Sequence, residues 1–460
     1  MEKSIKKYII GIVIVFVCVG MFSCKVGKKY TRPELNLPAA LVEGGKDTVT
    51  YADMKWWEVY TDTTLQSLIR KALEYNKDML IASARIKEMA AMKRISLANL
   101  LPQIDGTIYA EREMENYGGN NPDNANSFEG KLLFSWEIDL WGNLRWAREK
   151  SIAEYMQSIE AQRALKMTLI AEVAQAYFEL VALDNELTIV RQTLANRQEG
   201  VRLAKLRFDG GLTSETSYQQ AQVELARTAT LVPELEQSIA LKENDIAFLV
   251  GEYPHTIVKN IVHREIQLPD YLPVGLSSEL LKRRPDIRQA EQQLIAANAQ
   301  VGISFTDMFP RITLTGKYGL ESPSLSDFLK SPYGFMSGTL LNPIFEAGKN
   351  IARYKAQRYA YEQECYRYEK SVLSAFREVN NAIVNFNKIK EVYVSRKKLE
   401  EAAKSYVDLA QLQYINGVTR YLDVLDAQRL YFDAQIGLSN AIRDERIAIV
   451  YLYKALGGGW

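Results

Sequence analysis

Residues 203–213 read LAKLRFDGGLT, and residues 409–419 read LAQLQYINGVT. In both segments an apolar helical pattern ends at a glycine, which is a signal for a turn. The dipeptide Ala-Gln follows at the same spacing in each half, at 221–222 and at 427–428. We therefore predict that the chain is internally duplicated and that each half contains a helical hairpin with its tip at this glycine.

Long helices are predicted on both sides of each turn. Residues 147–208 contain no proline and repeat apolar residues in steps of three or four, and residues 213–250 return as a second helix. In the second half, residues 348–414 and the segment that returns to position 456 have the same pattern. A helix of about 60 residues would measure roughly 90 Å at 1.5 Å per residue. Helices of that length favour coiled-coil packing over a globular core.

Two strand patterns precede the long helix of each half. Residues 104–110 and 128–140 alternate in polarity in the first half, and residues 312–318 and 335–341 do so in the second. One face of the second strand carries Phe, Trp, Ile and Leu. The opposite face, which is expected to contact water, carries Glu129, Lys131, Glu137 and Asp139. Each half therefore has the order helix, strand, loop, strand, long helix, turn, long helix.

Four amphipathic strands are too few for a soluble sandwich, which needs about seven. If one face contacts lipid, the sheet must close so that no edge is exposed, and closed membrane barrels start at about eight strands. The predicted fold class is therefore mainly α with membrane β. In this fold, three chains form a twelve-stranded β-barrel that is continued by a long periplasmic α-helical coiled-coil barrel.

The N-terminus has the pattern of an export signal. Three lysines precede an apolar run at residues 8–19, which is too short to span a membrane as a helix. Residues 21–24, MFSC, resemble a bacterial lipoprotein cleavage site, although Met21 replaces the usual Leu. Cys24 is therefore predicted to carry a lipid. A signal peptide followed by a chance cysteine is the alternative.

Composition excludes several function classes. Lys and Arg number 57 against 56 Asp and Glu, so the net charge of +1 implies no nucleic-acid partner. Two His and three Cys are too few for a histidine metal centre or a cysteine cluster, and no motif indicates a cofactor or an enzyme. His255 and His263 are interpreted as surface residues.

The predicted domain organisation has five parts. They are a signal peptide (1–23), a lipidated arm (24–55), a first repeat (56–254), a linker (255–280) and a second repeat (281–457).

Several segments occur in an order that resembles one family. They are YTRP at 30–33, WW at 56–57, IDLWG at 138–142, RRPDIRQAE at 283–291, AANAQVG at 296–302 and PIFEAG at 343–348. The chain resembles outer-membrane efflux lipoproteins of the TolC and OprM (NodT) type. The resemblance implies a homotrimeric channel in the outer membrane of a Gram-negative bacterium. Its partners would be outer-membrane lipid, a periplasmic adaptor protein and an inner-membrane pump.

Two carboxylates follow the second hairpin turn, in the stretch LQYINGVTRYLDVLDAQ at 412–428. Asp423 and Asp426 lie three residues apart and share a helix face. Compensation of the helix dipole is one explanation. However, the matching positions in the first half are Ser217 and Gln220, and dipole compensation gives no reason for that difference. Three copies would gather six carboxylates, so we predict a charged ring at a periplasmic gate.

The family resemblance adds three residues to this predicted gate. Asp423 and Asp426 match the aspartates at the constriction of TolC-type channels, and Tyr414 matches a tyrosine that helps to hold the tips closed. Thr419 stands where that lock has an arginine, and Arg420 follows it. The lock is therefore either absent or rebuilt through Arg420.

Two alternative functions follow from the same sequence. Within the channel class, the protein could serve a type I protein secretion system. In a different class, it would be a structural coiled-coil lipoprotein, although strands with one water-facing side argue against that function. The motif at residues 283–302 and the predicted lipidation favour small-molecule efflux.

Overall fold

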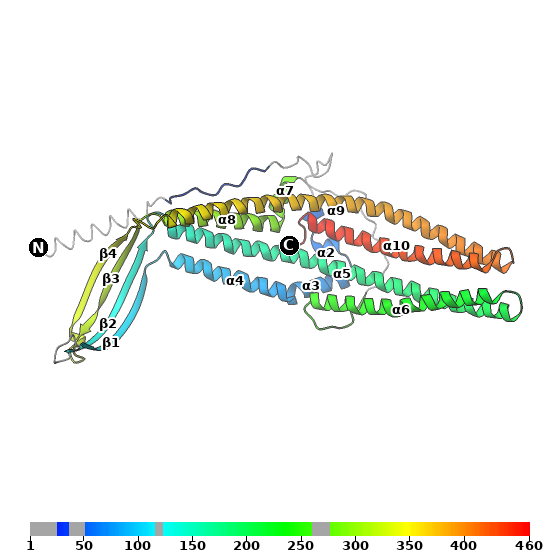
Figure 1. Ribbon diagram of the computed structural model, residues 1–460, viewed down its shortest axis with the longest axis horizontal. Coiled ribbons are helices and arrows are strands. Elements are labelled where there is room, and N and C mark those ends of the chain that lie inside the picture. The colour runs from blue at the N-terminus through cyan, green and yellow to red at the C-terminus, as the bar shows by residue number, and fades with distance from the viewer. Residues whose placement is uncertain (1–24, 36–50, 116–122, 260–276) are drawn as a thin grey trace. The chain divides into compact units, whose positions relative to one another are not determined.

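The computed structural model describes residues 25–35, 51–115, 123–259 and 277–460 (Figure 1). Cys24 and His263 lie outside the described residues. In chain order the elements are η1 (Tyr51–Asp53), α2 (Trp56–Val59), α3 (Thr63–Tyr75), α4 (Lys77–Ala98), β1 (Gln103–Glu115), β2 (Asp123–Ile138), α5 (Asn143–Asp209), α6 (Glu215–Leu249), α7 (Ser277–Arg283), α8 (Pro285–Thr306), β3 (Arg311–Ser322), η2 (Phe328–Lys330), β4 (Pro332–Leu341), α9 (Lys349–Ile415) and α10 (Tyr421–Ala455).

The element order repeats, which confirms the predicted duplication. Helices α4 and α8 each have 22 residues, α5 and α9 each have 67, and α6 and α10 each have 35. The predicted long helices begin and end within a few residues of the observed ones. The short helix α7 was not predicted.

The chain divides into two compact units. The described parts of residues 1–35, 84–159 and 289–370 form the first unit. The described parts of residues 36–83, 160–288 and 371–460 form the second unit.

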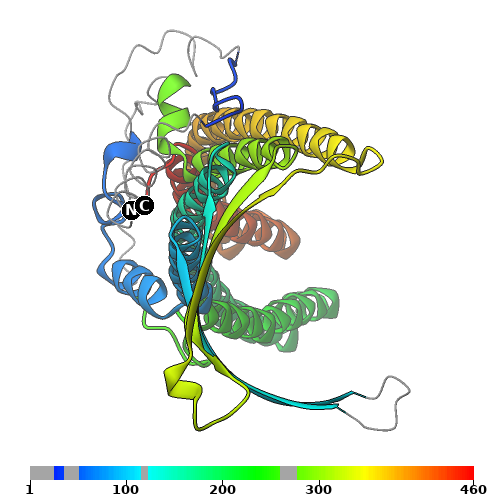
Figure 2. The same ribbon diagram turned by 90° about the vertical axis from the view of Figure 1, so that its left-hand side faces the viewer.

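The first unit contains one antiparallel sheet in the order β1-β2-β3-β4, and the sheet is curved (Figure 2). Its register places Leu132 between Gly106 and Tyr318, and the next residue, Lys131, between Thr107 and Gly319. Apolar side chains therefore gather on one face and polar ones on the other, as predicted. On the apolar face, several side chains are mostly exposed: Ile104, Ile108, Leu132, Tyr318 and Leu340.

The prediction was wrong for Asp139, which was expected to continue the water-facing side of the strand. Strand β2 ends at Ile138, and the carboxylate of Asp139 accepts hydrogen bonds from the N–H groups of Leu144 and Arg145, at 3.1 and 3.0 Å. These groups belong to the first turn of α5, where N–H groups have no partner within the helix. Asp139 therefore caps α5 instead of facing the water side of the sheet.

In the first unit, residues 25–35 are fastened to the helices at two places. The buried indole of Trp146 donates a hydrogen bond from Nε1 to the carbonyl of Val26 at 2.7 Å, and Lys25 Nζ lies 3.1 Å from the ring centroid. Further along, the guanidinium of Arg32 forms a bidentate ion pair with Glu291 of α8. These contacts hold the segment that follows the predicted lipid site.

In the second unit, the core lies among α3, α5, α6 and α10. Leu65, Tyr177 and Ile246 are among its fully buried side chains. Asp62 accepts hydrogen bonds from the N–H groups of Thr64 and Leu65, which caps α3, and its other oxygen accepts one from the hydroxyl of Tyr177 at 2.8 Å. The cap of a short helix is thereby connected to a long one.

Both hairpin tips in the second unit end in the same way (Figure 1). Gly211 and Gly417 have positive φ angles of 71° and 76°. After each glycine, an N–H group reaches back five residues, from Leu212 to the carbonyl of Arg207 at 2.8 Å and from Val418 to that of Gln413 at 2.9 Å. This is the Schellman helix end, which requires a left-handed residue and favours glycine. Gly211 and Gly417 therefore determine where the two hairpins turn.

Within the described residues, none of the helices combines enough length with enough hydrophobicity to cross a bilayer.

We predict that Gly302→Ala lowers stability. A Cβ atom at this position of α8 would lie 2.4 Å from the ring of the fully buried Trp146, and such overpacking costs about 1–3 kcal/mol. Gly200→Ala, also inside a long helix, is the control, because its Cβ would meet only the Tyr421 hydroxyl at 3.5 Å. The denaturation midpoint in guanidinium chloride should fall for Gly302→Ala and not for Gly200→Ala. Equal midpoints would contradict the packing argument.

Candidate functional site

The candidate site is the start of α10, in the second unit. The carboxylate of Asp423 accepts a hydrogen bond from the N–H group of Arg420 at 3.0 Å and another from the hydroxyl of Thr419. The Thr419 hydroxyl, followed by the Arg420 N–H group, lowers the pKa of Asp423. Asp423 therefore caps α10. Stabilising the start of this helix is one role of its carboxylate.

Asp426 differs from Asp423, although both are exposed. No hydrogen bond or ion pair of Asp426 occurs among the described residues. Arg429 lies three residues after Asp426 on the same helix. The charge of Asp426 adds to the effect of Glu224 in raising the pKa of Arg429. Asp426 is therefore the carboxylate of this pair that does not cap the helix and makes no hydrogen bond or ion pair within the described part of the chain.

The first hairpin lacks this arrangement. Ser217 occupies the position that matches Asp423, and the hydroxyl of Thr213, which matches Thr419, is buried without a partner in the described structure. The backbone bond is nevertheless the same, since Ser217 N–H donates to Ser214 at 3.1 Å and Asp423 N–H donates to Arg420 at 3.1 Å. The carboxylate is thus not required for this turn to form.

Tyr414 contacts an arginine of the other hairpin that no sequence motif indicated. The guanidinium of Arg207, on α5, lies 4.5 Å from the centroid of the Tyr414 ring, within cation–π range. The ring centroid of Tyr421, on α10, lies 5.4 Å from that of Tyr414, on α9. Within the described residues, the arginine over Tyr414 is therefore Arg207, and neither Thr419 nor Arg420 takes that position.

A buried ionic cluster joins the two hairpins. The side chain of Glu224, on α6, is 3% exposed; it lies 3.1 Å from Arg197 of α5 and also accepts a hydrogen bond from Arg429 of α10. Arg197 donates further hydrogen bonds to the carbonyl of Glu224 at 2.9 Å and to the hydroxyl of Thr228. The carboxylate thus holds one arginine from each hairpin.

The two arginines decide the charge of Glu224. Burial opposes its ionisation, but the hydrogen bond from Arg429 and the charge of Arg197 outweigh burial and lower the pKa of Glu224. Burial also lowers the pKa of Arg197, which depends on this carboxylate for compensation. We therefore describe Arg197, Glu224 and Arg429 as the hairpin cluster.

The sequence contained a signal for the hairpin cluster. Arg197 falls three residues after Leu194, where the apolar repeat of α5 would place another apolar residue. A charge on an apolar stripe calls for a buried partner. The partner could not be identified, because Glu224 and Arg429 are far away in the sequence.

A cavity of about 670 Å³ lies beside the hairpin cluster, between α5 and the hairpin of α9 and α10. Arg197, Arg207, Tyr414, Tyr421 and Phe432 are among its lining residues. Burial raises the pKa of Tyr421 to about 12. No group of three or more His, Cys, Asp or Glu suited to a metal ion occurs in the part of the chain that is described.

The chain is similar to known proteins over most of its length. The profile of the family described as outer membrane efflux protein matches residues 68–252 and 276–458. The chain is 32% identical to the toluene efflux pump outer membrane protein TtgI of Pseudomonas putida, over 91% of this chain and 90% of that protein. It is 28% identical to the cation efflux system protein CusC of Escherichia coli K12, over 96% of this chain and 98% of that protein. The crystal structure of the CmeC outer membrane channel of Campylobacter jejuni matches with a TM-score of 0.89 at 25% identity, over 95% of each chain.

We predict that Glu224→Gln loosens the start of α10. The variant leaves Arg197 buried without its carboxylate, and an unsatisfied buried group costs about 1–3 kcal/mol. Amide hydrogen exchange in α10 near Arg429 should become roughly tenfold faster or more. Because the pKa of Glu224 is lowered, the contact contributes above the ordinary carboxylate pKa and is lost as the pH falls through the lowered value. Wild-type protection should therefore persist at about pH 5.

Glu236→Gln is the matched control. Glu236 is also on α6 and pairs with Arg191 at 2.8 Å, but both side chains are more than half exposed, so the pair contributes about 0–1 kcal/mol. Equal exchange rates in the two variants would contradict a special role for Glu224.

Proposed function

The chain belongs to the outer membrane efflux protein family, and we propose that three copies form a channel that passes small molecules across the outer membrane. Membership of this family makes the protein a transport protein of the outer membrane and not an enzyme, as the sequence predicted. The trimer, the gate and the partners are the proposed parts.

The observation that carries the proposal is the four-stranded sheet with unlike faces. Among the described strands, β1 pairs only with β2, and β4 pairs only with β3. Unpaired N–H and C=O groups in lipid cost several kcal/mol each, so the sheet must continue into another sheet. Three copies joined from β4 to β1 would close a twelve-stranded barrel, with the exposed apolar face towards lipid and the polar face inside.

The polar face of the sheet carries more acidic than basic residues. By register its described acidic members are Asp105, Glu111, Glu113, Glu129, Glu137 and Glu321, and its basic members are Lys131, Arg311 and Lys317. In the proposed barrel these side chains would line water and attract cations. The channel would therefore conduct cations in preference to anions.

The proposed partners are a periplasmic adaptor and an inner-membrane pump, as in the tripartite systems that the family resemblance implies. The chain has no motif for a nucleotide or a cofactor, so it would not supply energy itself. Two similar proteins are named for different cargo, toluene and cations. The cargo of the proposed channel is identified by the susceptibility profile of a deletion strain.

The gate is proposed at the hairpin tips. In a trimer, the start of α10 would contribute Asp423 and Asp426 three times each. Carboxylates gathered around a narrow passage repel one another and favour bound cations. Arg207 over Tyr414 and the hairpin cluster would hold the two hairpins of one protomer together when the gate is closed. Opening would require these contacts to separate or to move as one body.

A lipid on Cys24 is the proposed second attachment to the membrane. The residues that follow it are fastened to the first unit through Lys25, Val26 and Arg32. An anchored residue followed by a fastened segment would fix the protein against the inner leaflet of the outer membrane.

Drug, metal and dye susceptibility of a deletion strain tests the efflux function. Deletion should increase sensitivity to at least one compound, and the wild-type gene should restore resistance. In the same strains, labelled palmitate should enter the wild-type protein and not the Cys24→Ser variant.

Two outcomes would support the alternative functions. An unchanged susceptibility profile together with loss of a secreted protein would support type I protein secretion. Absence of conductance in planar bilayers would support a structural lipoprotein.

The proposed gate is tested by single-channel recording of Asp423→Asn, Asp426→Asn and the double variant. Block by divalent or trivalent cations from the periplasmic side should weaken about tenfold or more in the double variant, and conductance should rise. Asp426→Asn should show much of this change with no loss of folding, because its carboxylate has no structural contact in the described chain. Glu215→Gln, an exposed acid at the first tip, should leave block unchanged. Unchanged block in the double variant would return both aspartates to a helix-end role.

A further inference from the structure

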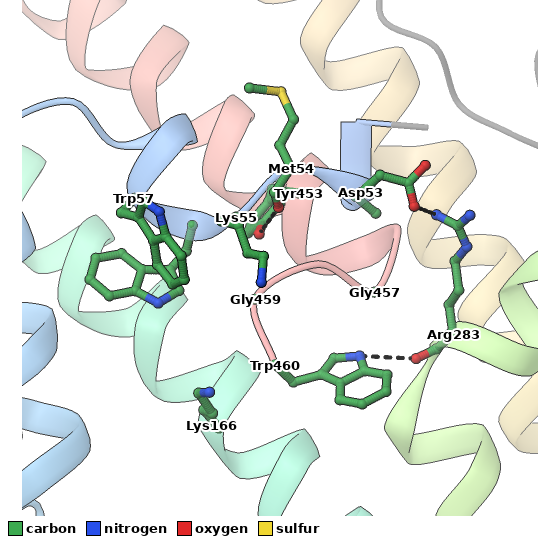
Figure 3. Close-up of a pocket in the computed structure, with 12 residues that line it drawn as sticks. Asp53, Met54, Lys55, Trp57, Lys166, Arg283, Tyr453, Gly457, Gly459 and Trp460 are labelled. Atoms are coloured by element: carbon green, nitrogen blue, oxygen red, sulfur yellow. Dashed lines mark hydrogen bonds and ion pairs between the residues drawn. The ribbon is translucent and has the colours of Figure 1, made fainter. Parts of the chain in front are cut away.

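A second cavity lies in the second unit, away from the hairpin tips. It has a volume of about 350 Å³, and its lining combines α2 and the residues before it with residues of α5, α7 and α10 and the segment that follows α10 (Figure 3). None of its lining residues belongs to the proposed gate or to the cavity beside it. Its volume is within the range of small-ligand sites, at the lower end.

One wall of this cavity is the segment after α10, which reads Gly457-Gly458-Gly459-Trp460. Gly458 packs so closely on Tyr453 that a Cβ atom would lie 2.3 Å from the ring. The indole of Trp460 donates a hydrogen bond from Nε1 to the carbonyl of Arg283 at 3.0 Å. The glycines therefore allow the chain to cross Tyr453 and place an indole at the cavity.

The Trp460 indole is fixed by two cations. The guanidinium groups of Arg163 and Arg288 lie 4.6 and 5.4 Å from its ring, and both arginines pair with the buried carboxylate of Glu160. A ring held by a hydrogen bond and two guanidinium groups loses little further freedom when a ligand binds. The wall is therefore preorganised.

The charges in this cavity are not balanced. Arg283 pairs with Asp53 at 2.6 Å (Figure 3), and the neighbouring Arg284 pairs with Asp286 and Glu378. By contrast, neither Lys55 nor Lys166 has a carboxylate within ion-pair distance among the residues that the structure describes. Two lining ammonium groups therefore lack a carboxylate partner within the described structure, while the arginines around them are all paired with carboxylates.

The lysines and the indoles lie on the same cavity. Figure 3 shows the ammonium of Lys55 directed towards the wall formed by Gly459 and Trp460. The same ammonium lies 5.3 Å from the ring of Trp57, which also lines the cavity. Burial, with a further effect of the Lys55 charge, lowers the pKa of Lys166. An anion between the two ammonium groups would relieve this repulsion.

We propose that this cavity binds a small organic anion. Its carboxylate or phosphate group would lie between the ammonium groups of Lys55 and Lys166, and its apolar part would pack against the indoles of Trp57 and Trp460. A cationic ligand would be repelled by the two lysines. An inorganic anion would use the charges and leave the indole surface uncovered.

The proposal is independent of the channel function, because binding is measured directly on the purified full-length protein. Isothermal titration calorimetry with benzoate should show saturable binding, whereas benzylamine, a cation of similar size, should not bind. The variant Lys55→Gln/Lys166→Gln should bind benzoate about tenfold more weakly or worse. Lys205→Gln removes an exposed lysine outside the cavity and should bind like the wild type. Phenyl phosphate in place of benzoate distinguishes a phosphate ligand from a carboxylate one.

A second measurement uses the wild-type protein alone, in case the double variant fails to fold. Benzoate should slow acylation of Lys166 by an amine-reactive reagent and leave acylation of Lys205 unchanged, as read by mass spectrometry. Absence of saturable benzoate and phenyl phosphate binding, or equal acylation with and without benzoate, would overturn the proposal. Inorganic phosphate binding as tightly as phenyl phosphate would overturn the role of the indoles.

Discussion

The two open edges of the four-stranded sheet are the constraint on which the rest of the proposed architecture depends. A backbone edge can be satisfied by water, by another strand or by a covering element. Here the outer strand β1 also carries exposed apolar side chains, such as Ile108, which is 92% exposed. These side chains indicate a surface that contacts lipid or protein and not water. Pairing with further copies would satisfy the edges and the apolar face at once. Because β1 and β4 are the outer strands, each copy offers one partner to each neighbour.

The two halves share one backbone plan and differ in charge. Gly211 and Gly417 end their helices with the same hydrogen bonds, so the fold of both tips depends on the left-handed glycine. The charged residues at the tips are not shared: Arg207 matches Gln413, and Ser217 matches Asp423. The pairing of unlike halves lets Arg207 of one hairpin lie over Tyr414 of the other. Duplication thus supplied the scaffold, and divergence between the copies supplied the contacts that join them.

Most of the fold could be predicted, because helices of this length and strands with unlike faces are local patterns. The four long helices were predicted to within a few residues of their observed ends, and the polar and apolar sides of β2 were assigned correctly as far as Ile138. Asp139 was assigned wrongly because period-two alternation continues through it, whereas its carboxylate is used by the first turn of α5. The hairpin cluster was missed because its three residues come from three helices. Spacing along one helix says nothing about partners on another.

The sequence by itself determined the duplication, the turn positions and the family, since these depend on periodicity, on glycines that adopt positive φ and on ordered motifs. It also identified Asp423 and Asp426, because the two halves could be compared position by position. Only the tertiary structure separated these two carboxylates, by giving Asp423 a helix cap and leaving Asp426 without a hydrogen bond or an ion pair among the described residues. Only the tertiary structure brought Arg197, Glu224 and Arg429 together, and Lys55 and Lys166 to one cavity. The physical reason is that burial and charge compensation are set by neighbours in space, which no single stretch of sequence contains.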